Sequence, residues 1–239
     1  MNIDSEQIQP KQAITATHNS RRVPLPRSNM SLALVQECAA ERSALESGIS
    51  KKFSKAYDAA LTEFLPNLLS LSASGELGAV VGVREAAIGE LFLEQYLDSP
   101  VEQSVAGVFR TPVDRSQIVE IGNLAAYVPG LAYTLFAVLA TVLDQAGFRW
   151  VVCTATPQVA AMLAKMGFSS QAICDADPAR LKNGAGAWGE YYASRPTVIA
   201  GDISSAAAKV YENREMAALI LQFAEPIARM AADLRKASS

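Results

Sequence analysis

The chain has 239 residues, of which 50% are hydrophobic, and its formal net charge is −3. This length and composition predict one large domain with a sizeable core, and the mild charge gives no reason to expect nucleic-acid binding. The single histidine, His18, excludes a histidine-rich metal site, and no metal is expected. Catalysis built on a histidine would depend on this one residue in a polar segment, so it is not expected either.

Residues 1–29 are polar and contain three prolines and three arginines, which predicts a flexible N-terminal tail. The opening residues, MNIDSEQIQP, lack the apolar stretch of a signal peptide, and no apolar run reaches the roughly 18 residues that span a membrane. The three cysteines are widely spaced and odd in number, so we expect reduced, buried thiols rather than disulfides. Together these features predict a cytoplasmic protein.

Helical periodicity extends over residues 31–46 and 50–63, and in the second stretch apolar residues recur at three- and four-residue steps. Pro66 ends that helix. Two apolar runs, 68–72 and 77–84, flank a Ser-Gly turn and predict a β-hairpin. Gly78 and Gly82 in the second run predict that another backbone or a ligand comes close to this strand.

Short helices are predicted at residues 88–97 and 101–108, before a strand that contains Glu120. The remaining elements are a helix at 130–146, a strand at 149–154, a helix at 156–167, strands around 168–174 and 197–203, and an amphipathic helix at 212–236 that Pro226 kinks or divides. Since helices alternate with strands in the second half, we expect an α/β (α+β) fold in which helices cover a mixed sheet. We assign residues 30–205 to the folded domain and 206–239 to a C-terminal helical extension packed on it.

The most informative segment runs from Gln117 to Ala132, QIVEIGNLAAYVPGLA. A strand buried on both faces is expected to be continuously apolar, yet Glu120 and Asn123 interrupt this one, and buried polar groups need partners or a function. A Pro-Gly turn then places free backbone N–H groups at the start of a helix, where a phosphate or a polarised carbonyl can bind. A carboxylate base beside such N–H groups is the minimum required for acyl transfer to an amine.

The order of elements resembles the GNAT-type N-acyltransferases. The segment GFRWVVCTATPQVAAMLAKMGF (147–168) is similar to the strand, helix and closing turn that lie beside the pantetheine arm of the acyl donor in that family. Of the family's Gln/Arg-x-x-Gly-x-Gly/Ala phosphate cradle, this chain keeps Gly130 and Ala132 but has Tyr127 at the first position. The resemblance implies a mixed, mostly antiparallel central sheet flanked by helices.

Acyl-homoserine-lactone synthases share that fold and also depart from the cradle. Their conserved glutamate and upstream arginine match Glu120 and Arg84, whereas Asn123 stands where they carry a second arginine. A closer resemblance, to the bacterial thermostable hemolysin family, rests on three motifs in order, LFLEQYLD (91–98), IVEIGNLA (118–125) and WGEYYASRPTVIAG (188–201). That family name records a haemolytic phenotype rather than a mechanism.

The resemblance to acyltransferases implies catalytic roles for three residues, and each also has a purely structural interpretation. Glu120 is the candidate general base, or a buried carboxylate paired with Arg84. Arg84 is the candidate clamp for a substrate carboxylate, or only the partner of Glu120. Asn123 is the candidate that orients the nucleophile, or a cap on a bulge in the strand.

Donor and acceptor sites follow in the same way. The expected acyl-donor site comprises Leu124, Ala125, Tyr127, Gly130 and Ala132, whose backbone amides would hold the donor and polarise its thioester carbonyl; the alternative is an ordinary strand-to-helix turn. The expected substrate-binding residues are Glu94, Trp188 and Tyr191. Glu94 would otherwise cap a loop, and the two aromatic residues would otherwise be packing residues.

The leading hypothesis is an N-acyltransferase that moves a fatty acyl group from acyl carrier protein or acyl-CoA to a small amine or amino acid and releases an amphiphilic product. The thioester is a cosubstrate, and no tightly bound cofactor is expected. The alternatives are a hemolysin that acts directly on membranes and a non-catalytic binding module with the same fold. Carrier proteins are acidic, so the candidate docking residues are basic: Arg21, Arg22, Lys51, Lys52 and Lys55.

Overall fold

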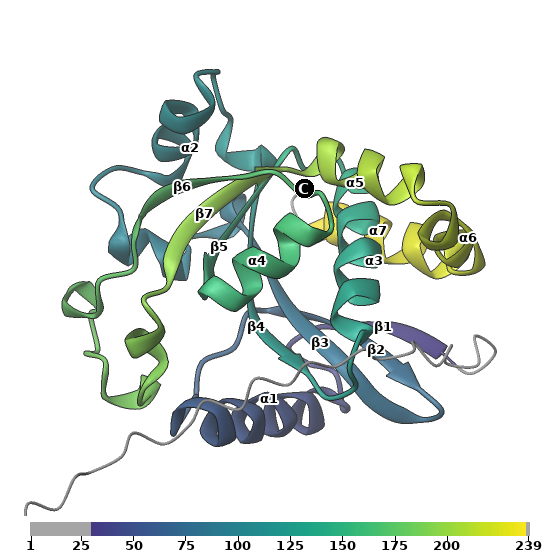
Figure 1. Cartoon of the computed structure of the whole chain (residues 1–239), viewed down its shortest axis with the longest axis horizontal. Coiled ribbons are helices and arrows are strands. Elements are labelled where there is room, and N and C mark those ends of the chain that lie inside the picture. Colours follow the sequence, from purple (N-terminus) through teal and green to yellow (C-terminus); the bar gives the residue numbers. More distant parts are fainter. Residues whose placement is uncertain (1–29, 238–239) are drawn as a thin grey trace, which may run out of the picture.

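A computed structural model describes residues 30–237; the predicted tail 1–29, with Arg21 and Arg22, lies outside the described residues. Seven strands form one sheet in the order β1-β2-β3-β4-β5-β7-β6 (Figure 1). Neighbouring strands are antiparallel except β4 and β5, which are parallel, so the mixed and mostly antiparallel sheet is confirmed. The strands are β1 (Met30–Val35), β2 (Asn67–Ala73), β3 (Glu76–Glu85), β4 (Ile118–Ala126), β5 (Trp150–Ala155), β6 (Ser170–Asp175) and β7 (Thr197–Asp202).

Helices cover both faces of the sheet (Figure 1). The described helices are α1 (Arg42–Tyr57), α2 (Val101–Phe109), α3 (Leu131–Gln145), α4 (Pro157–Lys165), α5 (Ile203–Glu212), α6 (Arg214–Gln222) and α7 (Ala224–Ala237). The largest core joins one face of the sheet to α3, α4, α5, α6 and α7. On the opposite face, α1 covers the first strands, and the segment 86–109 covers the strands that follow. A functional group on the sheet can therefore face either of two separate layers.

The hairpin was predicted correctly, and its turn explains why. Ser74 and Gly75 both have positive φ, 54° and 82°, as the primed turns of two-residue hairpins require. The two strand glycines do allow a close approach, but side chains come closest to them rather than the predicted backbone or ligand. A side chain at Gly78 would collide with Leu131 of α3, and one at Gly82 would meet the side chain of Leu65.

The N-terminal helices were predicted correctly only in part, because one helix replaces the two that were expected. Residues 30–35 form an edge strand in which half-buried and exposed residues alternate; so short an apolar run does not distinguish a period of two from a helical face. The helix α1 begins only at Arg42 and ends at Tyr57, because Asp58 takes a left-handed conformation with φ 53°. Residues 58–66 consequently reach β2 without a helix.

The structure agrees only in part with what was expected of segment 88–97, the C-terminal helix and the three cysteines. The segment 88–97 contains only 3-10 turns, among them η3 (Phe92–Tyr96), rather than one helix. The C-terminal helix is divided at Phe223, and Pro226 lies in the first turn of α7, where its missing N–H is tolerated. The cysteines are unpaired as expected, but only Cys153 is buried, since Cys38 is exposed and Cys174 is half-buried.

Neither a membrane-spanning helix nor a metal cluster is found in the described part of the chain. No helix within residues 30–237 is long and apolar enough to cross a bilayer. Within the same residues, no three His, Cys, Asp or Glu side chains come together as metal ligands would.

Candidate active site

The parallel strands β4 and β5 separate half-way along their length. Their pairing ends at Glu120 and Val152, although β4 continues to Ala126 and β5 to Ala155. A bulge bends β4 at this point, because the pairing with β3 shifts between Val80 and Gly82. Beyond Glu120, the edge of β4 that faces β5 is therefore unpaired along the ladder, and its backbone groups can accept another molecule.

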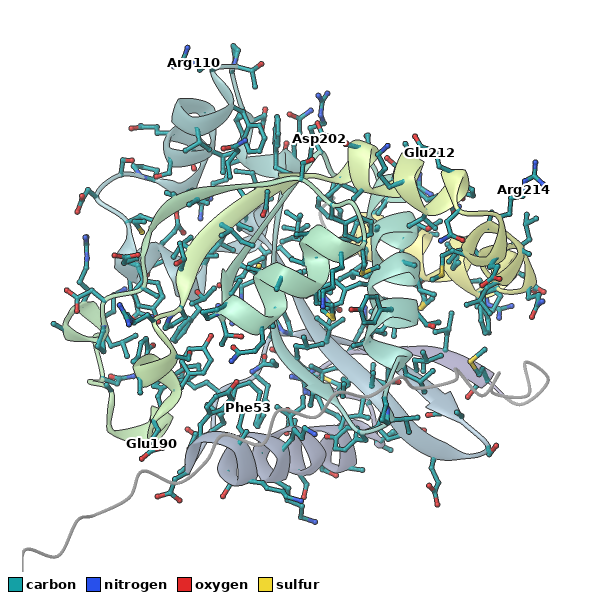
Figure 2. The ribbon with its side chains drawn as sticks, in the orientation of Figure 1. Phe53, Arg110, Glu190, Asp202, Glu212 and Arg214 are labelled. Atoms are coloured by element: carbon teal, nitrogen blue, oxygen red, sulfur yellow. The ribbon has the colours of Figure 1, made fainter. Side chains whose placement is uncertain are left out.

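A cavity of about 220 Å³ lies at this separation and extends to both faces of the sheet. Its wall on the side of α3 and α4 consists mostly of apolar side chains from Val81, Ile121, Phe136, Cys153 and Val159. Its opposite wall is aromatic: Phe53, Tyr57, Phe92, Tyr96, Trp188 and Tyr191. In Figure 2, Phe53 rises from α1 into the interior. The cavity thus offers two chemically different compartments on either side of one strand edge.

Glu120 lies where the strands separate, and its side chain is only 4% exposed. Its Oε2 accepts a hydrogen bond from the Phe92 N–H and its Oε1 from the Leu93 N–H, both at 2.9 Å. Burial raises the pKa of this carboxyl to about 7, even though the two amides and the charge of Arg84 act in the opposite direction. A rigid carboxylate with this pKa can accept a proton near neutral pH.

Arg84 pairs with Glu120 across β3 and β4 and lines the same cavity. The ion pairs of the described residues do not include one between the side chains of Arg84 and Glu120. The Arg84 guanidinium instead donates one long hydrogen bond of 3.4 Å to the Glu90 carbonyl. The purely structural interpretation, a direct salt bridge, is therefore not what this structure forms.

Asn123 also lines the cavity, but its side chain is occupied. Its Oδ1 accepts the Leu65 N–H at 2.8 Å, and its Nδ2 donates to the Glu63 carbonyl at 3.4 Å. Its φ of 51° places it in the left-handed region, which asparagine tolerates better than most residues. Of its two interpretations, the cap on a strand bulge describes these contacts, and the residue holds segment 63–65 as a wall of the cavity.

Trp188 and Tyr191 both belong to the aromatic wall. Trp188 packs on Phe92 with ring centroids 5.4 Å apart and on Tyr191 at 5.3 Å. Tyr191 meets the edge of Tyr57 at 5.3 Å, and its hydroxyl donates to the Thr154 carbonyl at 3.3 Å, where β5 has left β4. Tyr57 and Phe92 were not predicted as site residues, although Phe92 lies in the first family motif.

Glu94 does not line the cavity, because other groups occupy its carboxylate. Arg115 donates from both terminal nitrogens to its two oxygens, each at 2.7 Å, and the N–H groups of Leu91 and Val101 donate to it as well. Although burial alone would raise its pKa, these bonds lower the pKa to about 2. Glu94 therefore shapes the segment that presents Phe92 and Leu93 to Glu120.

Arg115 belongs to the same network, although it was not predicted as a site residue. Besides Glu94, it donates to Glu102 Oε2 at 2.9 Å and to the carbonyls of Ala86 and Gly89 at 2.8 and 2.9 Å. No local pattern marks it, since its partners lie 13 to 29 residues away in the chain.

Of the predicted donor residues, only Leu124 lines the cavity. Gly130 and Ala132 lie at the start of α3, where Gly130 has φ 88° and no side chain caps the helix. Ala125 is buried under α1. The N–H of Tyr127 donates to the Gly78 carbonyl, and its buried hydroxyl finds no hydrogen-bond partner among residues 30–237. The structure thus places Leu124 at the 220 Å³ cavity and residues 130–132 at a separate helix end.

The solved structures with a similar fold include acyl-homoserine lactone synthases and an N-acyl amino acid synthase. FeeM, an N-acyl amino acid synthase from uncultured soil microbes, matches with a TM-score of 0.50 and 16% identity over 72% of this chain and 89% of its own. The AHL synthase LasI matches with a TM-score of 0.49 and 11% identity over 74% and 91%. MesI, a CoA-dependent acyl-homoserine lactone synthase, matches with a TM-score of 0.48 and 13% identity over 76% and 94%.

The match to FeeM shows the GNAT-like fold that the sequence resemblance implied. No curated protein sequence matches this chain. A family model covers residues 35–207, well over half of the 239 residues and including all three motifs noted in the sequence. The chain belongs to the thermostable hemolysin family.

Proposed function

We propose that this protein is an N-acyltransferase. It joins a fatty acyl group to the amine of a small molecule that also has a free carboxylate, such as an amino acid. The observation that carries the proposal is the buried Glu120, with a pKa of about 7, at the point where a two-sided cavity crosses the sheet. FeeM, which shares the fold, is described as an N-acyl amino acid synthase, and this supports the same reaction class here.

In the proposed reaction the amine nitrogen attacks the carbonyl carbon of the thioester. The new C–N bond forms, the nitrogen gives a proton to Glu120, directly or through a water, and the C–S bond breaks to release a thiol that regains a proton. Unpaired N–H groups of β4 around Leu124 would stabilise the negative oxygen of the intermediate. Arg84 would hold the carboxylate of the acceptor, which fixes the amine beside the base.

The donor would lie with its acyl chain on the apolar side of the cavity, towards α3 and α4. Its pantetheine phosphate would reach the start of α3 near Gly130 and Ala132, where no side chain caps the helix and the helix dipole favours an anion. Acyl-CoA and acyl carrier protein share that phosphate, so both remain candidate cosubstrates. The free thiols fit the reducing cytoplasm, where we place the reaction.

Mass spectrometry of lipid extracts tests the proposed function. Cells that express the wild type are expected to contain a new acylated amine that is absent from cells with Glu120→Gln and from cells with empty vector. The mass and fragments of that product would identify both substrates. Equal extracts in all three would contradict acyl transfer in those cells and favour the binding-module alternative.

The haemolysis recorded in the family name would then come from the product, since acylated amino acids are amphiphiles. The test is direct: purified protein is not expected to lyse red cells unless a donor and an acceptor are supplied, and lysis by the protein alone would support the direct-toxin alternative.

We further propose that an acidic carrier protein docks on α1, where Lys51, Lys52 and Lys55 are exposed. Reversing Lys51 and Lys55 to glutamate is expected to raise KM several-fold for carrier-bound donor and to leave KM for acyl-CoA unchanged. Lys165→Glu, at the end of α4 on the other face, is the control. An equal rise in KM with both donors would reject the docking surface. Lys52 is left intact because it also lines the cavity.

A further inference from the structure

A second, smaller cavity of about 60 Å³ lies between α3, α5 and the strands β5 and β7. Its wall is almost entirely apolar, with Leu139, Ala140 and Leu143 of α3 on one side and Leu163 and Phe168 on the other. Phe136 and Ala140 are four residues apart on α3 and therefore share one helix face. Such a wall offers water few hydrogen-bond partners, so a hydrocarbon group is the ligand that its chemistry suits.

Three side chains separate the second cavity from the reaction cavity, because Ile121, Phe136 and Cys153 line both. Ile121 and Cys153 belong to the strands at their point of separation, directly after Glu120 and Val152. The partition is also electrostatically close to the proposed base: burial and the nearby Glu120 charge raise the pKa of the Cys153 thiol to about 12. A chain that crosses this partition would therefore come from a cavity that Glu120 also lines.

We propose that the second cavity receives the distal methylenes of the acyl chain and that Phe136 is the gate that sets the accepted chain length. This inference rests on the proposed function, since it needs a donor whose thioester lies near Glu120. Phe136 has the largest side chain of the three partition residues, so a change of its rotamer would open the widest passage between the two cavities. The donor class is then a long unbranched acyl group rather than a short one.

The size of the second cavity determines how binding affinity is expected to depend on the length of the acyl chain. It has room for about four groups of the size of water or methylene. Each methylene that leaves water is expected to strengthen binding about fourfold. Affinity should therefore rise with chain length until this cavity is full and then stop rising.

S-alkyl pantetheine thioethers of about 4 to 14 carbons test the gate, because pantetheine is common to both candidate donors and a thioether cannot react. Calorimetry with the full chain would give the dissociation constant at each length. Ala140→Leu, which fills the second cavity, is expected to shorten the limiting length by two or more carbons. Phe136→Ala is expected to strengthen binding of the longest chains about tenfold or more. Phe148→Ala is the matched control, since Phe148 is buried in the same core but lines neither cavity.

Each outcome decides the inference. An unchanged limit in Ala140→Leu, or the same profile in Phe136→Ala and Phe148→Ala, would overturn it. Because Ala140→Leu adds volume instead of removing it, a fold that does not tolerate Phe136→Ala still leaves a decisive variant. If the limiting chain lengths change as expected but no acylated amine is found in extracts, the alkyl-binding cavity is supported and acyl transfer is not. If no thioether binds at any length, both the alkyl-binding cavity and the proposed function are contradicted.

Discussion

Replacing Glu120 by glutamine is expected to lower kcat/KM about 10²- to 10⁴-fold, the usual contribution of a positioned general base. Glutamine keeps the shape of the side chain but cannot accept a proton at neutral pH. Initial rates with the donor and acceptor identified from lipid extracts would measure the loss. Glu90→Gln is the matched control, because Glu90 is exposed and pairs with Lys182. Equal losses in both variants would contradict a role for Glu120 as base.

The pH dependence of kcat/KM provides a sharper test of the same residue. Since the pKa of Glu120 is raised to about 7, the wild-type value should rise as pH increases through 7 and the carboxyl loses its proton. Glu120→Gln should lose this limb, while Glu90→Gln should keep it. A limb near pH 7 that survives in Glu120→Gln would assign the proton acceptor to another group.

The raised pKa of Glu120 should also make the free energy of unfolding depend on pH. In contrast to kcat/KM, this free energy should fall as pH rises. A carboxyl whose pKa is 4.5 in the unfolded chain and about 7 when folded stabilises the fold below pH 4.5 and loses that contribution as pH rises through 7. The loss is about 3 kcal/mol. Relative to Glu120→Gln, the wild type should therefore become less stable between about pH 5 and about pH 8 in urea unfolding. A constant difference would mean that the folded carboxyl titrates normally.

Much of the central site was predictable because polar residues interrupt a strand that is expected to be continuously apolar. A carboxylate in a strand that is otherwise apolar identified Glu120, and the antiparallel pairing of β3 with β4 places Arg84 opposite it. The separation of β4 from β5 was not predictable in the same way. It depends on a bulge and on Asn123, whose side chain finds its partners at residues 63 and 65, about 60 positions earlier in the chain.

The errors share this cause. The helical pattern of residues 31–46 fails because pairing with β2 stabilises an edge strand there, and tertiary contacts override local preference. Glu94 was expected at the substrate, yet its carboxylate is held by Arg115, which lies 21 residues further along the chain. The cavity wall is predictable only in part for the same reason, since its rings come from α1, segment 86–109 and the loop before β7.

Replacing Arg115 by methionine is expected to destabilise the fold by about 3–5 kcal/mol, because it leaves the carboxylate of Glu94 buried without a cation. The Glu94 side chain is only 11% exposed, and that of Arg115 is 29% exposed. For a chain of this size, such a loss lowers Tm by roughly 6–20 °C. Differential scanning calorimetry would measure it. Arg229→Met removes an exposed pair with Glu225 and should change Tm very little; equal shifts would contradict the buried-pair argument.

A double-mutant cycle measures the interaction free energy of Glu94 and Arg115 apart from the other contacts of each residue. If the cost of Arg115→Met comes mainly from the stranded charge, then Glu94→Gln with Arg115→Met should be more stable than the sum of the two single losses predicts. The double variant should still lower activity, because Phe92 and Leu93 are held towards Glu120 only through the segment that Glu94 and Arg115 tie down. Restored stability together with full activity would show that the network supports the fold but does not position the base.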